Sequence, residues 1–272
     1  MTILKSNCWK VVICILIAVL VDVILHVLFV PRINYNYQPS ILAEKGLILP
    51  AATAMLFVLF AIVAVVFVLI QKNMPGTKTM KGWRYGIAFG ILSLLAIIEM
   101  NLVFDSSLVD ELRGGAADGV SLVLLALILS WMTSTNNLII RQQTNLNWKP
   151  FVLIPLFFLI GRYFGYAIVH IMSAYMEKPG TTFLWTLSIG VWLSVMYQLL
   201  REERNDISAI LRAIRFGGLV FGSYWLIYNL FVLVFVQVSV LDLFVRFFID
   251  VVFVTASVWL VEVIEQRAAL NR

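Results

Sequence analysis

The chain has 272 residues and a mass of 30.8 kDa; 62% of its side chains are hydrophobic and only 13% are charged, with a net charge of +5 and a mean hydropathy of +0.97. An average soluble domain carries about 25% charged residues, so this chain has roughly half the charge that a water-facing surface needs. The composition argues against a soluble enzyme, a nucleic-acid-binding protein and a disordered chain, and it indicates an integral membrane protein.

Eight stretches are long and apolar enough to cross a bilayer, whose hydrocarbon core of about 30 Å needs about 20 residues of helix. In chain order they are residues 11–30, 51–70, 83–104, 116–132, 151–174, 181–200, 216–237 and 245–263. The loops between them are short, the longest being residues 31–50, so none can bury a core of its own. The sequence therefore predicts an all-α, polytopic bundle of about eight transmembrane helices.

Basic residues are distributed unevenly between the two sides of this bundle. With the N-terminus inside, the inner side holds Lys5, Lys10, Lys72, Lys78, Lys81, Arg84, Arg141, Lys149, Arg201, Arg204, Arg212, Arg215, Arg267 and Arg272, and the outer side holds Arg32, Lys45, Arg113, Lys178 and Arg246. Because positive residues near span ends stay cytoplasmic, we expect a plasma-membrane protein with both termini in the cytoplasm. Cys8 and Cys14 would then stay reduced, without a disulfide.

The two halves of the chain share a pattern. The third and seventh spans open with similar triplets, Arg84-Tyr85-Gly86 and Arg215-Phe216-Gly217, which are 131 residues apart. At an offset of 132 residues, the second half repeats Phe89-Gly90, Asp110 and Asp118 as Phe221-Gly222, Asp242 and Asp250. In the first helix of each half the offset is 140 residues, and it aligns Asp22, His26 and Tyr35 with Arg162, Tyr166 and Tyr175. Four spans per repeat is an even number, so the halves would be parallel, related by an axis along the membrane normal. The pattern predicts one four-helix repeat in residues 1–140 and a second in residues 141–272.

The first half also resembles small, uncharacterised four-helix integral membrane proteins of bacteria. The resemblance is carried by V-D-V-I-L-H at residues 21–26, N-Y-N-Y at residues 34–37 and G-W-R-Y-G at residues 82–86. The second half departs from this pattern, because Arg162 and Tyr166 replace the Asp and the His. The resemblance implies membrane placement and duplication of a four-helix unit, and it implies no activity.

Each half carries a GxxxG motif, at Gly86 and Gly90 and at Gly218 and Gly222. Glycines four residues apart leave a flat stripe on which another helix can pack closely. We expect packing within the chain, with a dimer interface as the alternative.

Several ionisable residues lie inside the predicted spans, where each costs roughly 2.5–3.5 kcal/mol on insertion scales and usually faces an interior or a cavity. They are Asp22, His26, Glu99, Asp118, Arg162, His170 and Asp250. Asp22 and Arg162 lie at matching depth in their spans, so they could form a central ion pair across a pseudo-twofold axis. Such a pair is either a salt bridge that fixes how the halves dock or part of a site for a charged solute or a proton.

Asp22 and His26 are four residues apart and share a helix face. We favour a structural, hydrogen-bonded histidine, with a proton relay as the alternative, because imidazole titrates near neutral pH. The pair could also supply two metal ligands, but the chain has only two histidines and no CxxC or HExxH spacing. We therefore expect no metal site and no cofactor.

The remaining polar candidates lie toward the outer ends of the spans. Glu99 is about 7.5 Å from the end of the third span at 1.5 Å per residue; Asn101 follows it, and Asn229 has a similar place in the seventh span. Asp118 and Asp250 would join Asp105, Asp110 and Glu111 in an acidic outer rim, which either attracts cations or amines or is a hydrated loop edge.

Two loops complete the sequence predictions. Tyr35 and Tyr37, in the outer loop of residues 31–50, suit the interfacial aromatic belt, and a lid over an outward cavity is the alternative. The inner loop of residues 201–215 mixes both signs of charge, so we expect a solvated helix extension with local ion pairs.

The sequence contains no Gly-rich phosphate loop, no GxSxG and no Ser–His–Asp arrangement, so we do not expect an enzyme. The leading hypothesis is a solute transporter or solute-binding component with a site between the halves, formed from Asp22, His26, Glu99, Asn101, Asp118, Arg162, Asn229 and Asp250. The alternative is a non-catalytic scaffold that docks a membrane-protein partner or a second copy through its GxxxG faces. The expected partners are the lipid bilayer and a small polar or charged solute, with no nucleic acid.

Overall fold

The computed structural model describes residues 2–31, 35–136, 148–202 and 207–270. Within these ranges the chain is helical apart from short connections, and an isolated antiparallel bridge joins Pro39 and Val236. Eight of the described helical segments are long and apolar enough to cross a membrane, which confirms the all-α polytopic bundle. The protein is therefore a multi-pass membrane protein.

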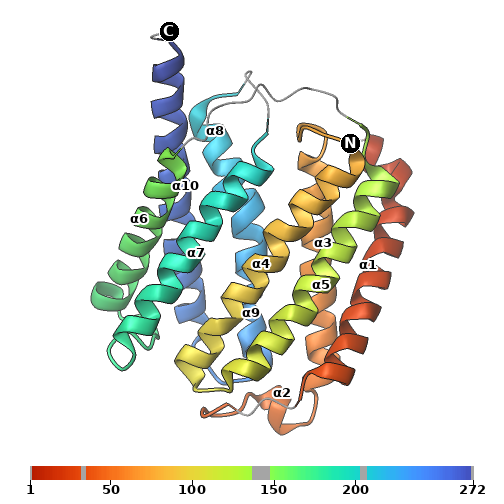
Figure 1. Ribbon diagram of the computed structural model, residues 1–272. Helices are drawn as coiled ribbons and strands as arrows, with labels where there is room; N and C mark the ends of the chain where they lie inside the picture. Colours follow the sequence, from red (N-terminus) through yellow and green to blue (C-terminus); the bar gives the residue numbers. More distant parts are fainter. Residues whose placement is uncertain (1, 32–34, 137–147, 203–206, 271–272) are drawn as a thin grey trace.

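The elements follow one another as α1 (Thr2–Phe29), α2 (Ile41–Glu44), α3 (Ile48–Ile70), α4 (Lys78–Phe104), α5 (Leu108–Thr133), α6 (Lys149–Phe164), the π-helix η1 (Gly165–Val169), α7 (Pro179–Leu200), α8 (Ala209–Ala213), the π-helix η2 (Ile214–Gly222), α9 (Ser223–Phe231), the 3₁₀-helix η3 (Val232–Val234) and α10 (Val240–Leu270). The fifth span joins α6 and η1, and the seventh runs from α8 to η3. The start of α1 and the end of α10 lie on one side of the bundle and α2 on the other (Figure 1), as an even number of spans requires.

Several helices extend beyond the predicted spans. α5 begins at Leu108 rather than at residue 116, and its first turn carries Asp110 and Glu111, whose charges complement the positive end of the helix dipole. α4 begins at Lys78 because the side chain of Thr77 accepts a hydrogen bond from the backbone N–H of Met80. Hydropathy marks the part of a helix that lipid surrounds, whereas backbone hydrogen bonding continues into the hydrated ends.

The packing of the helices is similar in the two halves. α1 packs against α3 and α5, and α4 against α5; correspondingly, α6 packs against α7 and α10, and the run from α8 to α9 packs against α10. Between the halves, α4 packs against α7 and α3 against α9. α3 also packs against α5, whereas the equivalent α7–α10 contact is at most slight among the described residues. Two parallel repeats would give most of this pattern, and the duplication itself stays a prediction.

The glycines of α4 pack within the chain, as expected. A Cβ atom on Gly86 would lie 2.8 Å from the Cα of Val123 in α5, and one on Gly90 would lie 3.0 Å from the carbonyl oxygen of Gly119. Contacts this short leave no room for a side chain, so these two glycines permit the close approach of α4 and α5.

In the second half, the prediction of a Gly218–Gly222 stripe is wrong. A Cβ atom on Gly218 would meet only Ile214 of its own helix, at 3.9 Å, whereas one on Gly217 would lie 2.8 Å from the Cα of Thr255 in α10. Gly222 does face α10, with Val251 at 3.1 Å. The reason is the π-helix η2, in which residues five apart share a helix face. Gly217 and Gly222 therefore face α10 together, whereas in the α-helix α4 the two glycines on one face, Gly86 and Gly90, are four residues apart.

The outer loop is attached to both halves. The backbone N–H of Asn36 donates to the carbonyl of Phe104 at the end of α4, and the hydroxyl of Ser40 donates to the carbonyl of Val234 in η3. The ring of Tyr35 packs against Phe104 and Phe235. The loop thus covers the ends of α4 and η3 on the side of the bundle opposite the chain ends. The predicted boundary between residues 140 and 141 lies outside the described residues, as do Arg32, Asn34, Arg141, Arg204 and Arg272.

Candidate functional site

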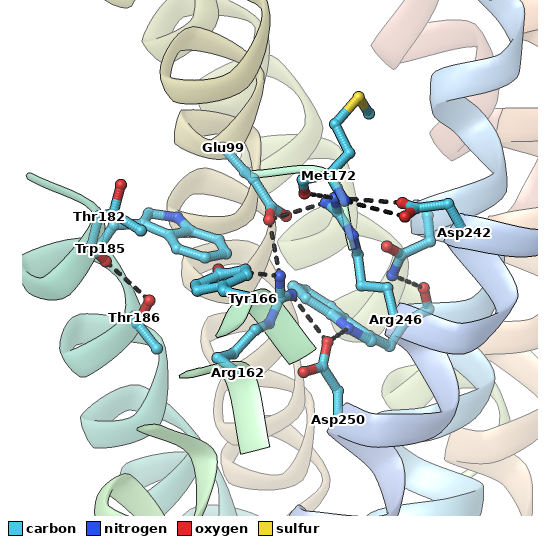
Figure 2. A network of polar contacts seen from close by, with 12 residues as sticks. Glu99, Arg162, Tyr166, Met172, Thr182, Trp185, Thr186, Asp242, Arg246 and Asp250 are labelled. Carbon is cyan, nitrogen blue, oxygen red and sulfur yellow. Dashed lines mark hydrogen bonds and ion pairs between the residues drawn. The ribbon is translucent and has the colours of Figure 1, made fainter. Parts of the chain in front are cut away.

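Arg162 is the central residue of a buried ionic network. It lies in the last turn of α6 and its side chain is fully buried. One guanidinium nitrogen is 2.8 Å from Oε1 of Glu99 in α4, and the other is 2.8 Å from Oδ2 of Asp250 in α10 (Figure 2). Both acids come from helices other than α1, so neither is the partner that the sequence suggested for this arginine.

A second arginine, Arg246 of α10, meets the same oxygen of Glu99 at 2.9 Å. Its guanidinium also donates to the carbonyl of Met172 and lies 3.7 Å from Asp242, one turn earlier on α10 (Figure 2). Two buried guanidinium groups thus converge on one carboxylate oxygen, and each arginine has a second carboxylate of its own. We call Glu99, Arg162, Asp242, Arg246 and Asp250 the arginine site.

Sequence reasoning placed Arg246 among the outer-side basic residues and missed its part in the site. A signal was present, because Asp242, Arg246 and Asp250 recur every four residues and so share one face of a helix. Such a line of alternating charge inside an apolar stretch indicates side chains that face one another in the interior.

Aromatic rings enclose the guanidinium of Arg162. Its Cζ lies 5.0 Å from the ring centre of Trp185, 5.5 Å from Phe158 and 5.8 Å from Trp225. The indole N–H of Trp225 donates to Oδ2 of Asp250 at 2.7 Å. The hydroxyl of Tyr166 is 3.5 Å from the guanidinium. These rings shield the ion pairs from lipid and strengthen them through cation–π attraction.

A small cavity adjoins the arginine site, with room for roughly one water molecule. Its lining consists of Glu99, Met100, Phe104, Met172, Tyr228, Asn229, Val232, Leu243 and Arg246. Helices of both halves contribute to it, so the cavity lies between the halves, where the sequence placed a site. A solute larger than water could bind there only if a group such as the Glu99 carboxylate moved.

The predicted Asp22–Arg162 ion pair is wrong. Asp22 pairs with His26 one turn later on α1, at 3.1 Å, and Nε2 of that imidazole is 3.7 Å from Oδ1 of Asp118 in α5. The hydroxyl of Ser93 is 3.3 Å from the other oxygen of Asp118. Matching depth did not bring Asp22 to Arg162 because α1 packs against α3 and α5, while α6 packs against α7 and α10. We call Asp22, His26 and Asp118 the histidine cluster.

The histidine cluster and the arginine site occupy corresponding positions. Asp22 and His26 match Arg162 and Tyr166 at the offset of 140, and Ser93 and Asp118 match Trp225 and Asp250 at 132. In each half the contacts join the first helix to the last and the last to the third, through Asp118 in one and Asp250 in the other.

The other candidates have local partners. The amide of Asn101 donates to the carbonyl of Ser106, which fastens the turn between α4 and α5, and the amide of Asn229 donates within its own helix while lining the cavity. His170 ends η1 in a left-handed conformation with φ +59° and is exposed. Only Asn229 of these three therefore adjoins the site.

The acidic outer rim is largely neutralised by its neighbours. Asp105 pairs with Lys178 at 2.8 Å and Asp110 with Arg113 at 3.1 Å. Glu111 is buried and accepts a hydrogen bond from Ser106 at 2.6 Å. Burial and the neighbouring Glu111 carboxylate raise the pKa of Tyr35 in the outer loop well above its ordinary value, so this phenol stays a neutral donor. The acidic residues of the rim thus form ion pairs and hydrogen bonds with neighbouring residues of the loops and helix ends.

On the side of the chain ends, ion pairs join α7 and the seventh span to α10. Glu262 of α10 is buried and lies 2.5 Å from the hydroxyl of Tyr197, 3.0 Å from Arg212 and 3.5 Å from Arg201. Arg201 also pairs with Glu265. Burial alone would lower the pKa of Arg201, but its acidic neighbours outweigh this and raise it. The predicted local ion pairs of this loop thus include acids of a distant helix.

Comparison with models of protein families, with curated proteins and with solved structures found no match. The resemblance to small four-helix membrane proteins therefore stays a prediction. Function has to be argued from the geometry of the site, because a helical bundle alone specifies none.

Proposed function

We propose that this membrane protein binds or transports a small solute with an anionic group, at the arginine site between the two halves. The observation that carries the proposal is the convergence of Arg162 and Arg246 on a single oxygen of Glu99, at 2.8 and 2.9 Å. Guanidinium groups are the usual partners of carboxylates and phosphates because their planar N–H donors match those oxygens.

In this arrangement the Glu99 carboxylate occupies the place of the solute's anionic group. When Glu99 moves away, Arg162 is still paired with Asp250. Arg246 is still close to Asp242 and still donates a hydrogen bond to the carbonyl of Met172. The exchange of Glu99 for an external anion therefore leaves neither arginine without a partner. A network built only for stability would gain little from this redundancy, since well-packed apolar residues are often as stabilising as a buried ion pair.

The same proposal includes two parallel four-helix repeats and a plasma-membrane location with both termini in the cytoplasm. The matching helix contacts of the two halves and the corresponding positions of the two polar clusters support the repeats. Transporters built from repeats usually bind their substrate near the repeat interface. The excess of basic residues on the side of the chain ends supports the orientation.

The docking alternative has less support. Gly86, Gly90 and Gly222, which would form the docking faces, are covered within the chain by α5 and α10. Gly218 does not face another helix, but one glycine is not a stripe on which a partner helix can pack.

A ligand screen on the purified, full-length protein in lipid nanodiscs tests the proposal. Thermal unfolding is measured with acetate, succinate, inorganic phosphate and a chloride control at equal ionic strength. We expect at least one carboxylate or phosphate to raise the midpoint for the wild type and not for Arg246→Gln, whereas Arg113→Gln, an exposed arginine on α5, retains the shift. Equal shifts in all three proteins would contradict the proposal.

A further inference from the structure

The histidine cluster brings three metal-ligating side chains together outside the arginine site. One ligand atom from each of Asp22, His26 and Asp118 lies within 4.8 Å of the others. The sequence placed only the first two together, four residues apart on α1, and no metal site was expected because the chain has only two histidines and no CxxC or HExxH spacing. The third ligand comes from α5.

Comparison with the second half shows which groups are missing from this cluster. Asp118 corresponds to Asp250, which binds the resident cation Arg162. At the positions of the two arginines, the first half has Asp22 for Arg162, at the offset of 140, and Gly114 for Arg246, at the offset of 132. The first half thus has the aspartate that corresponds to Asp250, but neither of the two arginines.

The carboxylate of Asp22 is buried and incompletely hydrogen-bonded. Asp22 is 2% exposed, and its Oδ1 is buried without a hydrogen-bond partner among the residues that the structure describes. The imidazole of His26 is the one basic group of the cluster, with its two ring nitrogens 3.1 Å and 3.7 Å from carboxylate oxygens of Asp22 and Asp118. A buried carboxylate oxygen without a donor is unfavourable, so a further cation at this place would stabilise the cluster.

The imidazole is oriented as in a metal site. Its Nδ1 is 3.1 Å from the backbone carbonyl of Asp22 and 3.1 Å from Oδ2 of the same residue, which leaves Nε2 to act as a ligand. The Asp22 carboxylate has to turn away from Nδ1 to reach an ion bound at Nε2. Nε2 lies 3.7 Å from Oδ1 of Asp118, close to the separation of two ligands that are each about 2.0–2.2 Å from one ion. A Cβ atom on Gly114 would lie 3.9 Å from Nε2, so the glycine keeps a side chain away from this nitrogen.

We propose that Asp22, His26 and Asp118 bind a divalent first-row transition-metal ion. One imidazole nitrogen and two carboxylates suit Zn²⁺, Mn²⁺ or Fe²⁺ better than Mg²⁺, which prefers oxygen ligands alone. The hydroxyl of Ser93, 3.3 Å from Oδ2 of Asp118, holds that carboxylate from the outer shell. His26 lies one turn from the end of α1 and is partly exposed, so an ion can reach it from the outer membrane interface.

Cobalt binding tests this inference, since Co²⁺ coordinated by nitrogen and oxygen gives visible absorption bands. The full-length protein in nanodiscs is treated with a chelator, titrated with Co²⁺ and then with Zn²⁺ as competitor, with Mg²⁺ in parallel. We expect one saturable cobalt site that Zn²⁺ displaces and Mg²⁺ does not. Asp118→Asn and His26→Gln should each weaken cobalt binding by about tenfold or more.

Asp110→Asn is the matched control, because Asp110 lies on the same helix two turns away and pairs with the exposed Arg113. It should bind cobalt as the wild type does. Gel filtration and circular dichroism identify variants that have lost their fold, and His26→Gln serves if Asp118→Asn does not fold. The inference is overturned if the folded wild type binds no cobalt, or if the folded ligand variants bind it as tightly as the wild type does. The solute screen at the arginine site is independent of either result.

Discussion

Replacing Arg162 by leucine removes a buried cation and leaves its acidic partners in place. Glu99 keeps Arg246, but Asp250, which is 1% exposed, keeps just the indole N–H of Trp225 as a donor in the described part of the chain. Breaking a buried ion pair by removing one partner typically costs about 3–5 kcal/mol, because the remaining charge stays buried without compensation. We therefore expect Arg162→Leu to lower the free energy of unfolding by about that amount, a change of about two to three and a half orders of magnitude in the equilibrium constant at about 1.4 kcal/mol per tenfold.

The double variant Arg162→Leu with Asp250→Leu isolates the physical cause. It removes both charges, and apolar residues in place of a buried pair are often neutral or stabilising. We expect it to recover most of the lost free energy. Arg113→Leu is the matched control: this arginine is 54% exposed in its pair with Asp110, so its loss should cost less than about 1 kcal/mol.

The assay is denaturant-induced unfolding of the purified protein in mixed micelles, followed by tryptophan fluorescence and by circular dichroism. Coincident transitions by the two probes allow a free energy to be extracted. The reasoning would be refuted if Arg162→Leu unfolded within about 1 kcal/mol of the wild type, or if the double variant were no more stable than the single one.

Three further predictions follow from the packing, the inner ion pairs and the topology. Gly86→Ala should destabilise by about 1–3 kcal/mol because its Cβ would lie 2.8 Å from backbone of α5, whereas Gly218→Ala should be nearly neutral; equal midpoints in thermal unfolding would contradict the packing argument. Glu262→Gln should cost about 1.5–3 kcal/mol in the same assay, since the charge that binds two arginines is lost, and an unchanged midpoint would mean that these pairs contribute nothing. In a cysteine-free background, Ser107→Cys should react with an impermeant thiol reagent on intact cells and Thr79→Cys only after permeabilisation; the reverse pattern would invert the orientation.

Much of the fold was predictable because a bilayer leaves few choices. A chain in hydrocarbon has to satisfy its backbone hydrogen bonds internally, so each long apolar stretch becomes a helix. The predicted spans therefore fall on the observed helices, and the errors are confined to their ends, as at Leu108. Which helix packs against which was not predictable from apolar composition, and this is why Asp22 was assigned to the wrong partner.

The charged residues of the site were predictable as a set, and their pairing was not. Glu99, Arg162 and Asp250 were candidates because ionised groups in a span need partners. The partner set became complete only with Arg246, which lies near the start of α10 and was counted with the basic residues that flank the outer ends of the spans. Its spacing of four from Asp242 and from Asp250 carried the missing information.

The π-helix η2 shows how one residue changes a helix face. The offset between the halves changes from 131 at Arg215-Phe216-Gly217 to 132 at Phe221-Gly222, so the second half has one additional residue between them. The structure accommodates it as η2, which contains both of these positions and aligns Gly217 with Gly222. The change of offset was visible in the sequence; that it is absorbed by a wider helical turn was not.

The central claim is that Glu99 occupies the place of an external anion between the two arginines, and Glu99→Gln tests it most directly. The affinity of the wild type and of this variant is measured by calorimetry in nanodiscs for whichever carboxylate or phosphate stabilises the wild type. Since an internal competitor lowers apparent affinity, its removal should tighten binding by about tenfold or more. Equal or weaker binding by a folded Glu99→Gln protein would contradict the account.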